Sequence, residues 1–217
     1  MSRLAVVGVG ATGGALLAGL HALGATEPLR LIDPDRVERS NLPRQPWFEA
    51  ADIGRPKAEV MAERLSHGYR GQVEPAVARL SEENCDQLLD EVALVFDGTD
   101  NWPVREAIQA WAARHQKAWI YMSVLGLSGM TALFRPGEGP CLYCLFGATI
   151  QQGPHCFEAG VLGPVAAAVA GEALDLYQRW GSGALEGFEL RLIDGAGGRT
   201  EVIRGRDRGC THFVSLR

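Results

Sequence analysis

Short apolar runs alternate with stretches of helical composition over the first 125 residues. Runs rich in Val, Ile and Leu predict strands at residues 3–9, 28–33, 92–98 and 118–124, and a weaker run predicts one at 72–80. Helix-forming stretches bounded by Gly, Pro or Ser predict helices at 14–24, 55–68, 81–91 and 101–116. This alternation specifies an α/β class, with a Rossmann-like, doubly wound, mostly parallel sheet.

The pattern changes after Gly126. The later elements expected are an antiparallel strand and turn, a polar loop, a Gly/Ala-rich helix and a β-hairpin, at 129–140, 146–160, 160–177 and 188–205 respectively. We therefore expect a single domain over residues 1–217. Its first half, 1–125, holds the parallel sheet, and its second half, 126–217, holds a C-terminal antiparallel β extension.

The composition is that of a globular chain, because 47% of the 217 residues are apolar and can form a core without disulfides. The net charge is -5 and no Lys/Arg cluster stands out, so nucleic acid is not an expected partner. The chain starts in an apolar strand instead of a signal peptide, and Glu172 and Asp175 interrupt the Gly/Ala-rich helix, so no membrane span is expected. A cytoplasmic protein that binds small molecules or other proteins is predicted.

A glycine-rich turn follows the first predicted strand. Gly8, Gly10 and Gly13 have the G-x-G-x-x-G spacing, in which glycine lets the backbone approach a polyphosphate and the next helix N-terminus favours negative charge. Asp33 ends the second predicted strand, where a carboxylate can accept hydrogen bonds from a ribose. These residues predict a nucleotide site without distinguishing NAD from ATP, and a tight turn without a ligand is the alternative.

Three more polar residues fall at the carboxyl edge of the predicted sheet. Arg44 offers a planar clamp for phosphate, Lys57 a point charge near a helix N-terminus, and Asp97 a hard oxygen ligand for Mg²⁺. Nucleotidyl transfer needs such groups because it must neutralise a developing pyrophosphate, whereas hydride transfer has little need of them. The alternative is that each is a solvated surface residue.

A set of motifs spans nearly the whole chain, from about Ala5 to Cys210. In order they are GVGATGG, IDPDRVERSNLPRQ, GRPKAEV, VFDGTDN, PCLYCLF and CFEAGVLGP. Together they resemble the ThiF/MoeB/HesA family, the prokaryotic relatives of the ubiquitin-activating enzymes. The resemblance implies an adenylation domain over residues 1–217 that uses ATP and Mg²⁺. Its substrate would be the C-terminal glycine carboxylate of a small ubiquitin-like protein, commonly a sulfur carrier ending in Gly-Gly, and the half at 126–217 would bind that carrier.

The resemblance also implies a nucleotide-binding set, which maps to Gly8, Gly10, Gly13, Asp33, Asp35, Asn41, Arg44, Lys57 and Asp97. Within it, Asp33 would hold the ribose and Asp97 the magnesium. Asn41, Arg44 and Lys57 would contact the triphosphate. Attack of a carboxylate on the α-phosphorus brings two anions together, so the site needs positive charge and alignment but no general base.

The five cysteines are odd in number in a chain expected to be cytoplasmic, which argues against a disulfide framework. Cys141 and Cys144, spaced C-x-x-C, suit half of a tetrahedral zinc site. In the family a second C-x-x-C completes this site, but here Cys210 is followed by Phe213 where the fourth cysteine would be. The fourth ligand is then His212, water or nothing, and reduced cysteines without metal are the alternative. A structural zinc is favoured.

Cys156 lies in the stretch that resembles the family's crossover loop over the adenylate. Some relatives use a cysteine here to form a thioester or an acyl disulfide with the carrier, so Cys156 joins the candidate catalytic residues. A bystander role is the alternative. A cysteine desulfurase or another sulfur donor would be a further partner.

Typical relatives begin with helices that bring an arginine to the ATP site of a partner subunit. Because this chain starts at the strand, that arginine is expected to be absent, supplied by another protein, or replaced by Arg55 or Arg105. The Gly/Ala-rich helix is a candidate dimer seam, although a helix buried within the monomer has the same composition. A homodimer is expected, with a heterodimer as the alternative.

Two other functions compete with adenylation. An NAD-dependent oxidoreductase explains the glycine turn and Asp33 but leaves Arg44, Lys57 and Asp97 without a role. A non-catalytic subunit of a heterodimeric activating enzyme would be expected to lose those same three residues. Adenylation explains the most residues, and the sequence leaves open which carrier and which sulfur pathway the chain serves.

Overall fold

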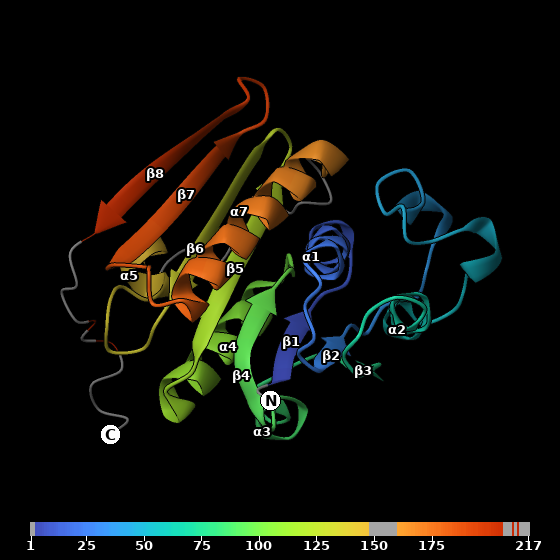
Figure 1. Ribbon diagram of the computed structural model, residues 1–217, viewed down its shortest axis with the longest axis horizontal. Helices are drawn as coiled ribbons and strands as arrows, with labels where there is room; N and C mark the ends of the chain where they lie inside the picture. The colour runs from blue at the N-terminus through green and yellow to red at the C-terminus, as the bar shows by residue number, and fades with distance from the viewer. Residues whose placement is uncertain (1–2, 148–159, 206–209, 211, 213–217) are drawn as a thin grey trace.

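One eight-stranded sheet forms the centre of the computed structural model, which describes residues 3–147, 160–205, 210 and 212 (Figure 1). The strands are β1 (Arg3–Val7), β2 (Leu29–Ile32), β3 (Val73–Ala76), β4 (Val92–Asp97), β5 (Ala118–Leu125), β6 (Ser128–Phe134), β7 (Phe188–Asp194) and β8 (Arg199–Gly205). Their order is β3-β2-β1-β4-β5-β6-β7-β8. The first five strands pair in parallel and the last three extend the sheet antiparallel, which confirms the predicted fold class.

Helices cover both faces of the sheet (Figure 1). One face carries α1 (Ala11–Ala22), α2 (Lys57–Ser66) and α7 (Gly163–Gly181), and the other carries α3 (Cys85–Leu88), α4 (Trp102–His115) and α5 (Leu142–Phe146). Two single 3-10 turns, η1 (Arg39–Asn41) and η2 (Ala50–Asp52), lie between β2 and α2. Each face buries its own apolar cluster, as expected for parallel strands that are hydrophobic on both sides.

The Gly/Ala-rich helix packs within the chain. It approaches α1 closely at Gly19, where an added Cβ would lie 2.2 Å from Leu174 Cδ1 of α7. Val165, Val169 and Ala173 of the same helix are buried in the core. One side of α7 is therefore buried within the single chain. Among the described residues, no helix is long and apolar enough to span a membrane.

Two predicted elements are shorter than expected. The third strand ends at Ala76 instead of continuing to Leu80, and the helix predicted over 81–91 is reduced to α3. The side chain of Asn84 explains the second difference, because its Oδ1 accepts the Ser81 N–H (2.8 Å) and its Nδ2 donates to the Arg79 carbonyl (3.0 Å). Such local side-chain bonds compete with helix formation.

Candidate active site

A cavity of about 380 Å³ opens at the carboxyl ends of the parallel strands. This volume lies in the range of about 300–1,000 Å³ that is typical of small-molecule sites. The cavity sits where the strand order reverses, between β1 and β4, which is the usual ligand crevice of a doubly wound sheet. Seven of the nine predicted nucleotide-binding residues line it, namely Gly8, Gly10, Asp33, Asp35, Asn41, Arg44 and Lys57.

The glycine turn brings the N-terminus of α1 to this cavity. Gly8 has a φ of +83°, and a Cβ on Gly13 would lie only 1.9 Å from the Gly8 carbonyl oxygen. Gly13 is therefore a packing residue behind the cavity wall. Gly10 caps α1 without a side chain, and Gly10, Ala11 and Thr12 line the cavity. The N–H groups of a first helical turn have no partner within the helix, so they can bind an anion.

Asp33 is fixed at the end of β2 by the backbone around it. Its Oδ2 accepts the Val9 N–H and its Oδ1 accepts the Asp35 N–H, each at 2.8 Å. Burial raises the pKa of Asp33, while the charge of Lys57 and the two amides oppose that increase. Each carboxylate oxygen keeps a second lone pair, so the group can accept hydrogen bonds from ribose hydroxyls.

Arg44 reaches the cavity from the segment between β2 and α2, and Lys57 reaches it from the start of α2. Lys57 is the first residue of α2, and its buried Nζ lies 3.0 Å from Asp35 Oδ2. Arg44 donates from Nη1 to the Ser40 carbonyl at 2.6 Å. Buried Asn41 accepts the Glu38 N–H at 3.0 Å and so shapes this segment. Both cations line the same cavity as the α1 N-terminus and can neutralise a polyphosphate there.

Gln45 is a site residue that the motif analysis did not single out. It is buried and lines the cavity, and its Oε1 has no hydrogen-bond partner among the described residues. A buried polar atom without a protein partner is uncommon, and at the cavity wall it could accept a hydrogen bond from a ligand. The only sequence signal for its role is its position directly after Arg44.

Asp97 does not line the cavity. It is fully buried, where Oδ1 accepts the Thr99 N–H (3.0 Å) and hydroxyl (2.7 Å) and Oδ2 lies 3.4 Å from Arg105 Nε. Burial raises the pKa of Asp97, and Arg105 and Thr99 oppose that shift. Asp97 thus holds the loop after β4 in place. The second aspartate of the same motif, Asp100, is exposed and lines the cavity.

Neither of the two arginines considered as replacements lies at the site. Arg55 pairs with Glu63 (2.5 Å) and Asp52 (3.2 Å) on the outer side of α2. Arg105 donates to the Thr99 carbonyl, and its guanidinium carbon lies 4.8 Å from the centroid of the Tyr121 ring. The lining of the cavity contains Arg36 and Arg79 instead.

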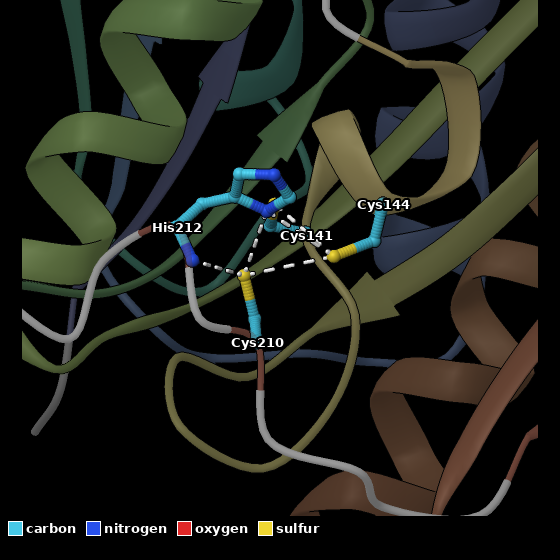
Figure 2. Close-up of side chains that lie close together, drawn as sticks. All are labelled: Cys141, Cys144, Cys210 and His212. Carbon is cyan, nitrogen blue, oxygen red and sulfur yellow. Dashed lines mark hydrogen bonds between the residues drawn. The ribbon is translucent and has the colours of Figure 1, made fainter.

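A second cluster joins α5 to the C-terminal region (Figure 2). The ligand atoms of Cys141, Cys144, Cys210 and His212 all lie within 4.8 Å of one another. Cys144 Sγ is 3.7 Å from Cys141 Sγ and 3.6 Å from Cys210 Sγ, and His212 Nδ1 is 3.4 Å from each sulfur. A tetrahedral zinc with three sulfur ligands and one nitrogen ligand requires separations of about 3.8 Å and 3.6 Å.

The cluster therefore fits the Cys₃His alternative, with His212 in the fourth position in spite of its C-x-H spacing. Burial, and to a lesser degree the neighbouring thiols of Cys210 and Cys144, raise the pKa of Cys141 to about 12. Metal binding would then release protons, because zinc binds the thiolate. Cys156, most of the predicted loop at 146–160, and Phe213 lie outside the described residues.

Comparison with known proteins gives a consistent result. The model of the ThiF family matches residues 1–204. The chain is 37% identical over 185 residues to the sulfur carrier protein adenylyltransferase of Thermus thermophilus, covering 80% of this chain and 68% of that protein. It is 32% identical over 220 residues to the sulfur carrier protein ThiS adenylyltransferase of Escherichia coli, covering 96% and 84%.

A third relative, the SAMP-activating enzyme E1 of Haloferax volcanii, is 34% identical over 75% of this chain and 60% of its own length. Among solved structures, E. coli MccB with AMPCPP and MccA superposes with a TM-score of 0.80 over 97% of this chain and 66% of that chain. At 18% identity, that likeness shows the fold alone. The chain thus spans between about three-fifths and about four-fifths of the length of the four proteins compared.

Proposed function

This chain belongs to the ThiF family, and on that premise we propose that it adenylates the C-terminal glycine of a small ubiquitin-like sulfur-carrier protein with Mg-ATP. The observation that carries the proposal is the cavity itself, which gathers the glycine turn, Asp33, Arg44 and Lys57 around one volume. A carboxylate at the carboxyl end of β2 and two cations beside a helix N-terminus suit a nucleoside triphosphate. The names of the relatives supply the carrier as acceptor.

The residues of the cavity would align and neutralise the two reacting anions. A carrier carboxylate oxygen forms the new bond to the α-phosphorus, while the bond to the bridging oxygen breaks and pyrophosphate leaves. Lys57, Arg44 and the α1 N-terminus would stabilise the charge on the phosphates. Asp100 would be the carboxylate that holds Mg²⁺, and buried Asp97 would position its loop. When bound, Mg²⁺ would supply further positive charge to the phosphates.

The predicted partners and the second metal are part of the same proposal. The carrier tail would enter beside β5, whose Met122, Ser123 and Val124 line the cavity. The Cys₃His cluster would hold a structural zinc that connects α5 to the C-terminal region. A sulfur donor such as a cysteine desulfurase would act on the adenylated carrier, and a homodimer remains the expected assembly.

Exchange of labelled pyrophosphate into ATP, with carriers ending in Gly-Gly, tests the assignment of the site. Lys57→Ala should lower the exchange rate by about 100-fold or more, since a preorganised cation is lost from the reacting phosphates. Lys117→Ala, a lysine away from the cavity, is the matched control and should retain the rate of the wild type. Equal rates for the two variants would contradict the proposed site.

The same assay separates the two aspartates of the loop. Asp100→Asn should lower exchange and raise the Mg²⁺ concentration needed for half-maximal rate, with the melting temperature unchanged, because Asp100 is exposed. Asp97→Asn should lower the melting temperature, because it removes one partner of a buried ion pair, at a cost of about 3 kcal/mol. If the Mg²⁺ concentration for half-maximal rate rose in Asp97→Asn and stayed unchanged in Asp100→Asn, the assignment would be wrong.

A further inference from the structure

One end of the nucleotide cavity is lined by a segment that none of the motifs includes. Ala78, Arg79 and Leu80 follow β3 and all three line the cavity. The third strand was expected to continue through these residues, but it ends at Ala76, and the chain leaves the sheet there. Because β3 is short, this segment lies at the cavity instead of in the sheet.

The order of the strands indicates which part of a nucleotide would meet the segment. In the proposed site the α1 N-terminus at the end of β1 would face the phosphates, and Asp33 at the end of β2 would face the ribose. Neighbouring strands lie about 4.8 Å apart, so the end of β3 is one further step beyond the ribose. The Asp33 N–H donates to the Ala76 carbonyl at 3.2 Å, so the segment begins directly beside the ribose site. The base is the part of the nucleotide that extends in this direction.

Arg79 differs from the other cations that line the cavity. The guanidinium of Arg36 donates to the Gly54 carbonyl (2.6 Å), that of Arg44 to the Ser40 carbonyl (2.6 Å), and Lys57 pairs with Asp35 (3.0 Å). The Arg79 side chain is exposed and makes no hydrogen bond or ion pair with the residues that the structure describes. It is therefore available to a ligand without breaking a contact to any of those residues.

The backbone at Arg79 is nevertheless fixed. Asn84 Nδ2 donates to the Arg79 carbonyl at 3.0 Å, and the next side chain, Leu80, is buried at 3% exposure. These two anchors keep Arg79 at the cavity wall. Ala78 and Leu80 add apolar surface at the same end. A planar cation beside apolar walls suits the face of an aromatic ring, on which arginine stacks well.

We propose that Arg79 is a nucleotide-binding residue that stacks its guanidinium on the purine base of ATP and closes the base end of the cavity. This inference rests on the proposed function, because it requires that the cavity bind an adenine nucleotide. It assigns to Arg79 affinity for the base and no direct part in the chemistry at the phosphates.

Binding of AMP, ADP and ATP to the full chain and its variants, measured by calorimetry, tests the inference. Arg79→Ala should weaken all three nucleotides by the same factor, about five- to tenfold, as expected for a lost cation–π contact. It should leave the affinity for ribose 5-phosphate, which has no base, unchanged. Arg79→Lys should recover only part of the loss, since an ammonium lacks the planar face. Arg70→Ala, an exposed arginine outside the cavity lining, is the matched control.

Two results would overturn the inference while leaving the proposed function in place. A loss that grows from AMP to ATP and is restored by lysine would assign Arg79 to the phosphates. An unchanged affinity for all three nucleotides would assign it to the solvated surface. Failure of the wild type to bind any adenine nucleotide would instead remove the proposed function itself, so the two failures are distinguishable.

Discussion

At the scale of single residues, three glycines set how closely α1 approaches the sheet. A Cβ on Gly13 would lie 1.9 Å from the Gly8 carbonyl oxygen, and a Cβ on Gly98 would lie 2.8 Å from the same atom. In both cases the obstacle is a backbone atom, which cannot rotate away as a flexible side chain can. The three glycines therefore place the α1 N-terminus against the ends of β1 and β4, where the cavity opens.

Replacement of Gly13 tests this packing. Gly13→Ala should lower the free energy of unfolding by about 3 kcal/mol, because the backbone must move to admit a methyl group. Gly10→Ala is the matched control, since its Cβ would lie 3.6 Å from Gln45 Nε2, an ordinary contact, and it should cost less than about 1 kcal/mol. Urea denaturation measures both values. Equal stability of the two variants would contradict the close approach of Gly13 to Gly8.

The sequence was most informative for residues whose position follows from local spacing. Gly8, Gly10 and Asp33 lie where the strand-turn-helix pattern predicts them. Local spacing did not show which of Asp97 and Asp100 lines the cavity, because burial of Asp97 depends on β4 lying between β1 and β5. No local pattern gives that strand order, so Asp100 and Gln45 emerged only in the folded chain.

At the scale of elements, an ion-pair network centred on buried Arg191 and Glu189 connects α7 to β7. Arg191 of β7 pairs with Glu172 and Asp175 of α7 at 2.5 Å each and with Glu189 at 3.1 Å. Glu189 is only 2% exposed. Burial alone would raise the pKa of Glu189, but hydrogen bonds from Arg179, Arg191 and Arg204 outweigh it and hold the pKa below its ordinary value. The hydrophobic pattern predicted α7 and β7, but not this pairing between them.

Glu189→Gln should lower the free energy of unfolding at pH 7 by about 3 kcal/mol, since it removes the buried carboxylate that Arg179, Arg191 and Arg204 share. Because the folded-state pKa of Glu189 is lowered, its contribution is present above the ordinary value of 4.5 and is lost as pH falls through the folded-state value. The stability difference between wild type and variant should therefore shrink below about pH 4.5. Exposed Glu186→Gln is the control and should have little effect at either pH. A difference independent of pH would contradict the ionised network.

At the scale of the whole molecule, the cysteine and histidine cluster connects distant parts of the chain. Cys141 directly precedes α5 and Cys144 lies within it, whereas Cys210 and His212 follow β8 (Figures 1 and 2). The C-x-x-C spacing predicted half of this site. The family resemblance added Cys210 and left His212 as one choice for the fourth ligand, and the fold brings both residues to the cluster although C-x-H is not a usual zinc spacing. The cluster thus connects the antiparallel extension back to α5.

Metal analysis should find one zinc per chain, and Cys141→Ser should lose it. Loss of the metal should lower the melting temperature by about 5–10 °C, as expected for about 2–3 kcal/mol in a chain of this size. Cys85→Ser, a buried cysteine outside the cluster, should keep the zinc. A chain without zinc, or a Cys141→Ser variant with the wild-type metal content, would contradict the assignment.

Several predictions made at this scale are not tested by the structure. The covalent role of Cys156, the homodimer, the cytoplasmic location and the absence of a nucleic-acid partner stay predictions. Cys156 lies outside the described residues, and the others concern partners or surroundings that a single chain does not contain. The fold class and most of the cavity, by contrast, follow from the alternation of strand and helix patterns, which predicts a doubly wound sheet.

The central claim is that the chain transfers AMP to the C-terminal carboxylate of a carrier. The intact mass of a small ubiquitin-like carrier ending in Gly-Gly, measured after incubation with the chain and Mg-ATP, tests it most directly. The account predicts a gain of one adenylyl group, matched by release of one pyrophosphate, and no gain for the same carrier without its last glycine. A chain that binds ATP but adenylates no such carrier would contradict the claim and leave a non-catalytic subunit as the better description.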